Sequence, residues 1–341
     1  MRATHKNVLL ALALSPLLAL SILAAEPGAP YPNAAVVSDQ KAGSLLVYNI
    51  YSSSSTEFNE LNTRISLTNV NQLAQAYVHL FFVDGASCGV ADSFLCLTPN
   101  QTVAFLMSDV DPGVTGYLVA LAVDERTGCP ISFNYLIGDE FCKLPSGHFG
   151  NLLAEAFAAQ YDGAAECDGN SPTATLWFDG TGRPGSYNHL PRTLAADNIA
   201  DRPTGNSTLL VVNRIGGNLS FAAATVNKLF GILYDDAEHG YSFSLEAGTC
   251  QVRTELTNTT PRLTPRFETI IPAGRSGWLK LYTTDTTGGL LGAVFNYHPE
   301  TGSVANAFNG GHNLHKLTFN DANAGTVNAP NLSVPVFPPT C

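Results

Sequence analysis

Charged residues are scarce in this sequence: they make up 13% of its 341 residues, against roughly 25% in ordinary soluble domains. The formal net charge is −11, and no run of basic residues is present. A chain this acidic attracts neither nucleic acid nor anionic lipid, so we exclude both as partners. Asn, Thr, Ser and Gly supply the polar residues instead, a composition typical of exposed β structure and turns.

The cysteines lack the spacings of metal and haem sites, because no CxxC or CxxCH occurs. In an exported chain they are expected to form disulfides, and we consider the short pairings Cys88–Cys96 and Cys129–Cys142. The chain has seven cysteines, an odd number, so one thiol is left without a partner within the chain. We expect this to be Cys341, the last residue, which would link two copies as a homodimer unless Cys167 or Cys250 reaches it. The candidates are Cys88, Cys96, Cys129, Cys142, Cys167, Cys250 and Cys341.

Only one long apolar run is present, the 18 residues from Val8 to Ala25. Basic residues precede it and Glu26 follows it, which is typical of a secretory signal peptide. We therefore predict cleavage of residues 1–25, an extended N-terminal segment at 26–42, and a secreted or cell-surface protein without a membrane span. An uncleaved anchor is the alternative, since 18 apolar residues are just enough to cross a bilayer.

Two parts of the chain resemble each other at offsets between 160 and 166 residues. Residues 44–49 match residues 208–213, Cys88 matches Cys250, and Gly116-Tyr117-Leu118 matches Gly277-Trp278-Leu279. Further matches follow in the same order: 97–99 with 263–265, Asp124 with Asp285, 133–135 with 295–297, and Gly147-His148 with Gly311-His312. Such an ordered series indicates an internal duplication.

Each copy is predicted to consist of short strands with almost no helical periodicity. Residues 63–69 alternate polar and apolar, as a strand with one wet face does, and turn signals separate the apolar runs. The expected strands of the first copy are near 44–50, 63–69, 76–84, 102–108, 117–124 and 130–137. We therefore predict an all-β fold with two tandem antiparallel β-sandwiches, Ig-like or jelly-roll-like, at 43–150 and 206–322.

Two segments fall outside the predicted sandwiches. The connector, residues 151–205, opens with the one helical candidate, at 151–160, and contains a predicted strand at 174–178. The Pro-rich tail, residues 323–341, contains a strand-like stretch at 332–337. The connector is too apolar for a free linker, so we expect it to pack on the domains.

The strand patterns at 62–69, 78–84 and 133–138 resemble secreted bacterial proteins with tandem Ig-like sandwich modules and no assigned activity. The resemblance covers most of the mature chain. It implies a place at the surface or outside the cell, and it carries over no functional residue.

Gly85-Ala86-Ser87-Cys88-Gly89 fits the GxSxG pattern of a hydrolase nucleophile elbow. That motif requires a helix directly after the turn, and residues 90–99 are too short and broken to form one. A hairpin loop carrying a disulfide cysteine is therefore the preferred interpretation of the segment.

Metal sites have two candidate groups. Asp235, Asp236 and Glu238 form an acidic cluster that would suit calcium on a loop, although the full calcium-loop pattern is absent. His312 and His315 have the wrong spacing for a helical zinc pair. His312 also matches His148 of the first copy, so a structural role is favoured for that position. No other cofactor is expected.

No set of residues forms a coherent catalytic site, so we expect a non-enzymatic structural or adhesive protein outside the cell. The alternative is an extracellular carbohydrate-binding or carbohydrate-active protein that uses the groove between the domains. Its aromatic candidates are Trp177 and Tyr187 in the connector, because aromatic rings make suitable sugar platforms. Trp278 is expected in the core.

Overall fold

The computed structural model describes residues 36–54, 62–143, 149–168, 170–285, 287–298, 310–319 and 324–341. Almost all regular structure in this part of the chain is β-strand, so the all-β prediction is confirmed. The predicted signal peptide lies outside the described residues. None of the described helices has the length and apolar character needed to cross a membrane.

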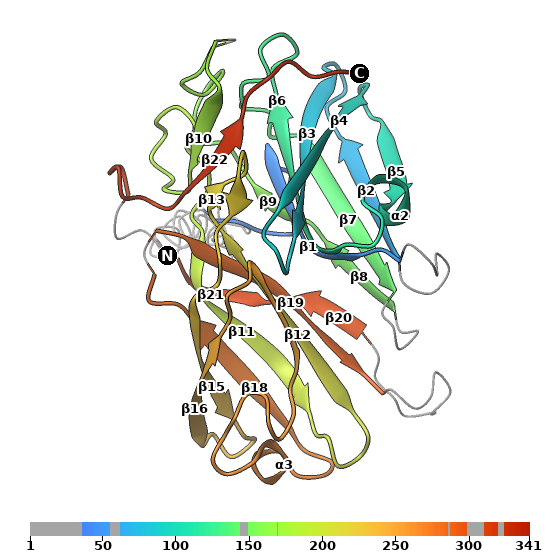
Figure 1. The fold of residues 1–341 in the computed structure, drawn as a ribbon, viewed down its shortest axis with the longest axis vertical. Coiled ribbons are helices and arrows are strands. Elements are labelled where there is room, and N and C mark those ends of the chain that lie inside the picture. The colour runs from blue at the N-terminus through green and yellow to red at the C-terminus, as the bar shows by residue number, and fades with distance from the viewer. Residues whose placement is uncertain are drawn as a thin grey trace, which may run out of the picture. The chain divides into compact units, whose positions relative to one another are not determined.

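The first sandwich packs the sheet β4-β3-β6-β1-β9 against the sheet β5-β2-β7-β8 (Figure 1, blue to green). Its core includes Leu46, Tyr48, Leu67 and Leu118, which are all fully or almost fully buried. Its elements are β1 (Leu45–Ser52), β2 (Thr63–Asn69), β3 (Ala76–Asp84), β4 (Val90–Leu97), β5 (Thr102–Leu106), α2 (Met107–Val110), β6 (Thr115–Val123), β7 (Leu136–Lys143), β8 (Phe149–Leu153) and β9 (Glu155–Phe157).

The second sandwich packs the sheet β16-β15-β18-β11-β21 against the sheet β17-β12-β19-β20. Leu194, Leu210, Leu279 and Val294 lie in its separate core. Its elements are β11 (Pro191–Ala200), β12 (Ser207–Ile215), β15 (Lys228–Tyr234), β16 (Gly240–Glu246), β17 (Gln251–Glu255), α3 (Phe267–Ile270), β18 (Ser276–Tyr282), β19 (Gly289–Tyr297), β20 (Gly310–Asn313) and β21 (His315–Phe319).

The two sandwiches have the same strand order. Replacing β1 and β2 by β11 and β12, β3 to β6 by β15 to β18, and β7 to β9 by β19 to β21 converts the first pair of sheets into the second. The shared order supports the predicted duplication, which itself remains a prediction.

A bulge recurs at the same place in both sandwiches. The pairing with the neighbouring strand shifts between Tyr48 and Tyr51 in β1, and between Ala196 and Ile199 in β11. A bulge of this kind bends its strand and redirects the side chains on it. In β11 the redirected residues are Asp197 and Asn198.

The alignment behind the duplication is wrong in several places. Residues 45–49 and 208–213 lie in β1 and β12, whereas β11 occupies the place of β1 in the second sandwich. Residues 133–135 precede β7, whereas residues 295–297 end its counterpart β19. Cys88 and Cys250 are bonded to each other and do not occupy equivalent places. Buried strands share similar apolar runs wherever they lie in a sheet, so a match between two such runs does not show that the strands are equivalent.

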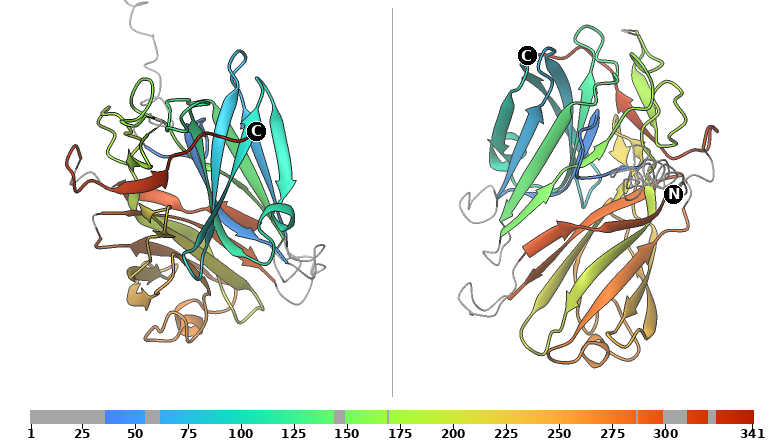
Figure 2. Two further views of the ribbon diagram at one scale, coloured as in Figure 1. Left: turned by 45° about the horizontal axis from the view of Figure 1, so that its top comes forward. Right: turned by 180° about the vertical axis from the view of Figure 1, so that it is seen from behind.

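A third sheet covers the outer face of the first sandwich. It has the order β10-β22-β13-β14, and Figures 1 and 2 show β10 and β22 beside that sandwich. Leu176, Leu332 and Val334 pack in one cluster with Phe81 and Val119 of the covered sheet. Its strands are β10 (Thr173–Trp177), β13 (Gly217–Asn218), β14 (Ala222–Ala223) and β22 (Asn331–Pro335), so the strands predicted in the connector and tail are confirmed.

The helix predicted at 151–160 is wrong, because β8 and β9 occupy most of this segment and complete the first sandwich. β8 pairs with β7 and β9 pairs with β1, so sheet pairing overrides a local pattern that suited a helix. The connector is correspondingly shorter than 151–205, since β11 already belongs to the second sandwich. The sequence also missed β4, and the strand expected at 130–137 begins only at Leu136.

The disulfides connect distant parts of the chain. Cys88 bonds to Cys250, Cys96 to Cys341 and Cys129 to Cys167, with Cα–Cα distances of 5.5, 6.1 and 5.9 Å. Both short pairings proposed from the sequence are therefore wrong. The remaining thiol is Cys142, which is buried, so the predicted homodimer through Cys341 is not supported. Spacing along the chain could not reveal which turns the sheets bring together.

The two sandwiches meet in a buried contact with a polar centre. Ile50, Leu152, Val211 and Phe295 belong to its apolar cluster. The buried Asn213 side chain of β12 donates a 2.8 Å hydrogen bond to the backbone carbonyl of Asn49 in β1. The Cys88–Cys250 disulfide also joins the two sandwiches covalently.

Candidate binding site on the second sandwich

A hollow of about 790 Å³ lies among β11, β18, β19 and β20 of the second sandwich. This volume is within the range of small-ligand sites. Its lining is rich in amide, hydroxyl and charged side chains: Asn198, Asp201, Thr204, Asn206, Arg275, Ser276 and Asn296. Such groups can donate and accept hydrogen bonds in several directions.

Asp201 holds one wall of the hollow in place. Its buried carboxylate accepts hydrogen bonds from the Thr204 hydroxyl at 2.8 Å, from Asn206 Nδ2 at 3.1 Å and from the Gly274 backbone N–H at 3.1 Å. Burial by itself would raise the pKa of Asp201, but these hydrogen bonds outweigh it and lower the pKa. Asp201 therefore remains ionised and ties the turn after β11 to the turn before β18.

The β11 bulge forms another part of the wall. Asn198 adopts a positive φ of 52°, a backbone conformation that Asn tolerates better than most residues. Asn296 Nδ2 donates a 3.0 Å hydrogen bond to the Asn198 carbonyl, and Asn296 Oδ1 accepts one of 2.7 Å from the Thr208 hydroxyl. The wall is therefore preformed by a chain of side-chain contacts.

A partly exposed aromatic pair lies on the sheet that also carries Ser276 of the hollow. Trp278 stacks on Tyr234 with ring centroids 4.2 Å apart and an interplanar angle of 6°. Trp278 is two residues from Ser276 on the same strand, so both side chains point to the same face of the sheet. Trp278 is 37% exposed, and the prediction that it lies in the core is wrong.

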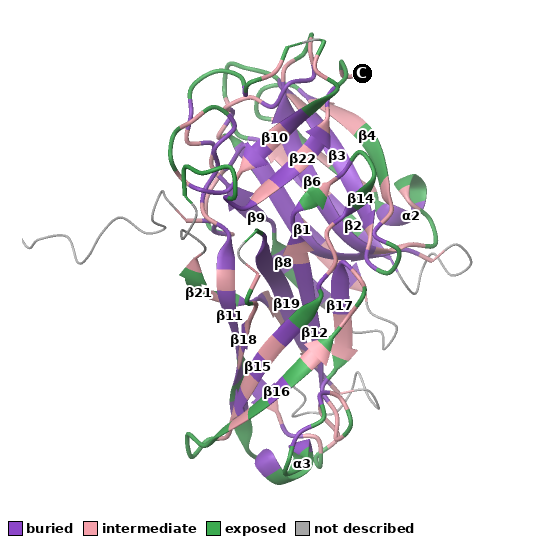
Figure 3. Cartoon of the chain, turned by 60° about the vertical axis from the view of Figure 1, so that its left-hand side comes forward, coloured by how far each residue is buried: buried purple, intermediate pink, exposed green. Residues whose placement is uncertain are grey.

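The outer face of the sheet that contains β15 and β18 is exposed, whereas the corresponding face of the first sandwich is covered. Tyr117 of β6 pairs with Val83, as Trp278 of β18 pairs with Tyr234. Tyr117 and Val83 are buried with residues of the third sheet, because that sheet covers the outer face of the first sandwich. Figure 3 shows the contrast: β1, β3 and β6 are buried along most of their length, whereas β15 alternates buried with partly exposed residues and β16 is exposed or partly exposed along most of its length.

The predicted calcium ligands do not form a joint site. Asp235 Oδ1 accepts hydrogen bonds from the backbone N–H groups of Ala237 and His239 within its own turn. Asp236 forms an ion pair with Arg275 instead. The three acidic side chains form no cluster with the spacing of a metal site.

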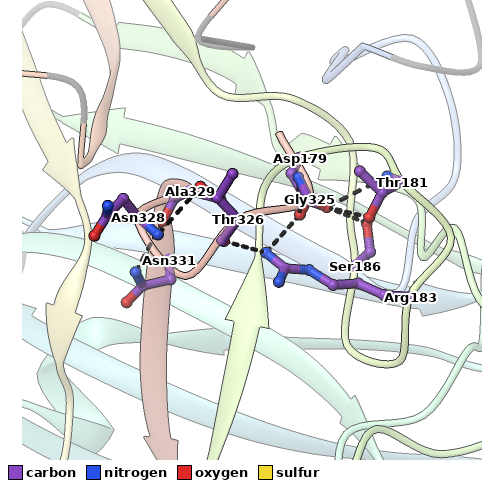
Figure 4. Close-up of polar contacts among 9 residues, drawn as sticks. All are labelled: Asp179, Thr181, Arg183, Ser186, Gly325, Thr326, Asn328, Ala329 and Asn331. Carbon is purple, nitrogen blue, oxygen red and sulfur yellow. Dashed lines mark hydrogen bonds and ion pairs between the residues drawn. The ribbon is translucent and has the colours of Figure 1, made fainter. Parts of the chain in front are cut away.

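The two aromatic residues predicted to bind a ligand do not form a platform together. Tyr187 is completely buried. The Arg183 guanidinium lies 3.9 Å from the centroid of the Trp177 ring and covers one face of it. Arg183 is held in turn by Asp179 at 2.6 Å and by the Thr326 carbonyl at 3.1 Å, which connects the connector to the C-terminal segment (Figure 4).

The GxSxG segment lacks the structure of a nucleophile elbow. It forms the turn between β3 and β4, and a strand follows it where the motif needs a helix. The Ser87 hydroxyl donates to the Asp84 carboxylate at 2.6 Å. Cys88 is bonded to Cys250, so the preferred interpretation as a disulfide-bearing hairpin agrees with the structure.

His312 and His315 lie beside Asp197 at the margin of the hollow, and within the described ranges these three form one group that could hold a metal ion. Sequence reasoning weighed the two histidines but missed Asp197, which is more than one hundred positions earlier. No local signal connects the three residues, because strand pairing brings them together. The aromatic pair and the polar lining were also missed, for the same reason.

Comparison with protein-family models, with curated proteins and with solved structures gives no match for this chain.

Proposed function

We propose that this protein is a non-enzymatic protein of the cell surface or the extracellular space that binds glycans through the second sandwich. The observation that carries this proposal is the hollow with its amide, carboxylate and guanidinium groups, together with the exposed Trp278 two residues along β18 from Ser276 in the lining. Adjacent sugar hydroxyls need closely spaced donors and acceptors, and amide, carboxylate and guanidinium groups supply them. The apolar face of a sugar ring needs an exposed aromatic side chain beside those groups.

The remainder of the molecule supports a binding role as a rigid body. Three disulfides, the buried contact between the sandwiches and the third sheet constrain the chain. A site preformed on such a scaffold loses little conformational entropy when a ligand binds. The signal-peptide pattern and the resemblance to secreted sandwich proteins motivate the extracellular placement.

A glycan array probed with the mature protein tests the proposal. We expect selective retention of some glycans, and loss of that retention in Trp278→Ala. Tyr282→Ala is the matched control, because Tyr282 is on the same face of the same strand and stacks on Phe230 with centroids 5.5 Å apart, but is farther from the hollow. Absence of any retained glycan, or equal losses in both variants, would count against the proposal.

A further inference from the structure

Asp197, His312 and His315 come from three different strands and meet at one point. Asp197 Oδ1 lies 3.0 Å from His312 Nε2 and 3.4 Å from His315 Nε2. Metal–ligand distances of 2.0 to 2.1 Å place neighbouring ligand atoms of a tetrahedral zinc about 3.3 Å apart. The two distances from Asp197 Oδ1 therefore match the spacing that one tetrahedral ion requires, and the three ligand atoms all lie within 4.8 Å of one another.

The neutral form of His312 presents a lone pair, and no proton, to Asp197. His312 Nδ1 lies 2.9 Å from the backbone carbonyl of Asn313, and a carbonyl can only accept, so Nδ1 carries the proton. In the neutral ring Nε2 then has a lone pair, which faces the Asp197 carboxylate. A bound cation, or a second proton on the ring, removes this repulsion.

The surroundings resemble the outer shell of a metal site. Metal-ligating histidines usually donate their other ring N–H to a carbonyl or carboxylate, as His312 does here. The second oxygen of Asp197, Oδ2, accepts a hydrogen bond of 3.3 Å from Asn198 Nδ2. Between the two histidines, Leu314 is buried in the core of the second sandwich and fixes the point where β20 passes into β21.

The first sandwich has no such set at the corresponding positions. Asn49 occupies the β1 bulge as Asp197 occupies the β11 bulge. The strand pairings place Leu152 where His312 lies and Glu155 where His315 lies. The shared fold therefore does not require the two histidines, and these side chains are not explained by packing: His312 is 40% and His315 59% exposed.

We propose that Asp197, His312 and His315 bind Zn²⁺ on the second sandwich. Imidazole nitrogen favours zinc and neighbouring transition metals, whereas Ca²⁺ and Mg²⁺ require oxygen ligands. Three protein ligands leave the fourth position of a tetrahedral ion for water or a ligand. The site is distinct from the predicted acidic cluster at Asp235, and it does not depend on glycan binding.

Titration calorimetry on the mature protein, produced without a histidine tag and freed of metal with a chelator, tests the site. We expect one Zn²⁺ to bind per chain near neutral pH. His312→Ala, His315→Ala and Asp197→Ala should each weaken binding at least about tenfold. His239→Ala is the matched control and should bind like the wild type, because the exposed His239 lies 3.0 Å from Asp235 and no third ligand joins them among the described residues.

Two further measurements separate ligand loss from misfolding. The near-UV circular dichroism of each metal-free variant should equal that of the wild type, because the substituted side chains are partly or largely exposed. Co²⁺ should give the visible bands of a tetrahedral complex in the wild type and not in His315→Ala. Absence of saturable Zn²⁺ binding, unchanged affinity in the three variants, or displacement of Zn²⁺ by excess Ca²⁺ would overturn the proposal.

Discussion

The carboxylate of Glu155 in the first sandwich lies 2.7 Å from the ammonium group of Lys316 in the second. Glu155 is completely buried, and its Oε1 atom has no hydrogen-bond partner in the described part of the chain. Burial raises the pKa of Glu155 to about 7, although the positive charge of Lys316 acts against this shift. The contact between the sandwiches therefore includes a group that titrates near neutral pH.

We predict that stability falls as the pH rises through neutrality. A carboxyl group whose pKa is raised in the folded state holds its proton more tightly there than in the unfolded chain. The contribution of Glu155 to the free energy of unfolding is therefore complete below about pH 4.5 and is lost as the pH passes about 7. A shift of this size is worth on the order of 3 kcal/mol.

The variant Glu155→Gln keeps the shape of the protonated side chain and should flatten the decline between pH 5 and pH 8. The free energy of unfolding, from denaturant titrations at both pH values, measures the effect. Glu246→Gln is the control, because Glu246 is exposed and pairs with Lys228 at 3.4 Å. Equal declines in the wild type and Glu155→Gln would contradict the prediction.

The disulfide pattern predicts one protected thiol and no covalent dimer. Mass spectrometry of a non-reduced digest should find Cys88–Cys250, Cys96–Cys341 and Cys129–Cys167. Cys142 is buried, and burial raises its pKa well above the ordinary value, so an alkylating reagent should label it only after unfolding. A covalent dimer on a non-reducing gel would disagree with this pattern.

Loss of the disulfide between the sandwiches should destabilise the protein more than loss of the Cys129–Cys167 bond. Cys88 and Cys250 are separated by 162 positions, and Cys129 and Cys167 by 38. Removing a native disulfide costs roughly 2–5 kcal/mol, and chain entropy favours the longer loop by about 1 kcal/mol. Guanidinium denaturation of the two double Cys→Ser variants measures the difference, and the opposite order would refute the argument.

Equivalent glycines in the two sandwiches should be equally intolerant of a side chain. A Cβ at Gly116 would collide with the carbonyl oxygen of Val83, and one at Gly277 with that of Tyr234. We expect Gly116→Ala and Gly277→Ala each to lower the free energy of unfolding by about 2 kcal/mol or more. Gly248→Ala is the control, because nothing surrounds its Cβ position. If only one of the two variants is destabilised, the two glycine positions are not equivalent in energy.

The polar centre of the contact between the sandwiches should be sensitive to Asn213→Ala. The Asn213 side chain donates a hydrogen bond of 2.8 Å to the Asn49 carbonyl and accepts one of 2.8 Å from Gln251 Nε2. Both hydrogen bonds are buried. Its removal leaves buried partners unpaired, at a cost of roughly 1–3 kcal/mol. Thermal unfolding measures the loss, with the exposed Asn328→Ala as control. An unchanged midpoint would mean that water replaces the amide.

The local pattern of the sequence determined the all-β class and most strands of the first sandwich. Alternation at 63–69 and the apolar run at 76–84 predicted β2 and β3 with their observed bounds, because a strand side chain is buried or exposed with a period of two. The scarcity of charge and the mixed Asn, Thr, Ser and Gly content agree with sheets joined by many turns.

Only the tertiary structure decided which residues meet. The sequence suggested short disulfides and a helix at 151–160, whereas sheet pairing brought Cys88 to Cys250 and made that segment β8 and β9. Asp197 reaches His312 and His315 because β11 bulges beside β20 and β21. Trp278 is exposed, whereas its counterpart Tyr117 is buried in the cluster that includes the third sheet. Such contacts depend on strand order and on what covers each face, and a local pattern carries no information about either.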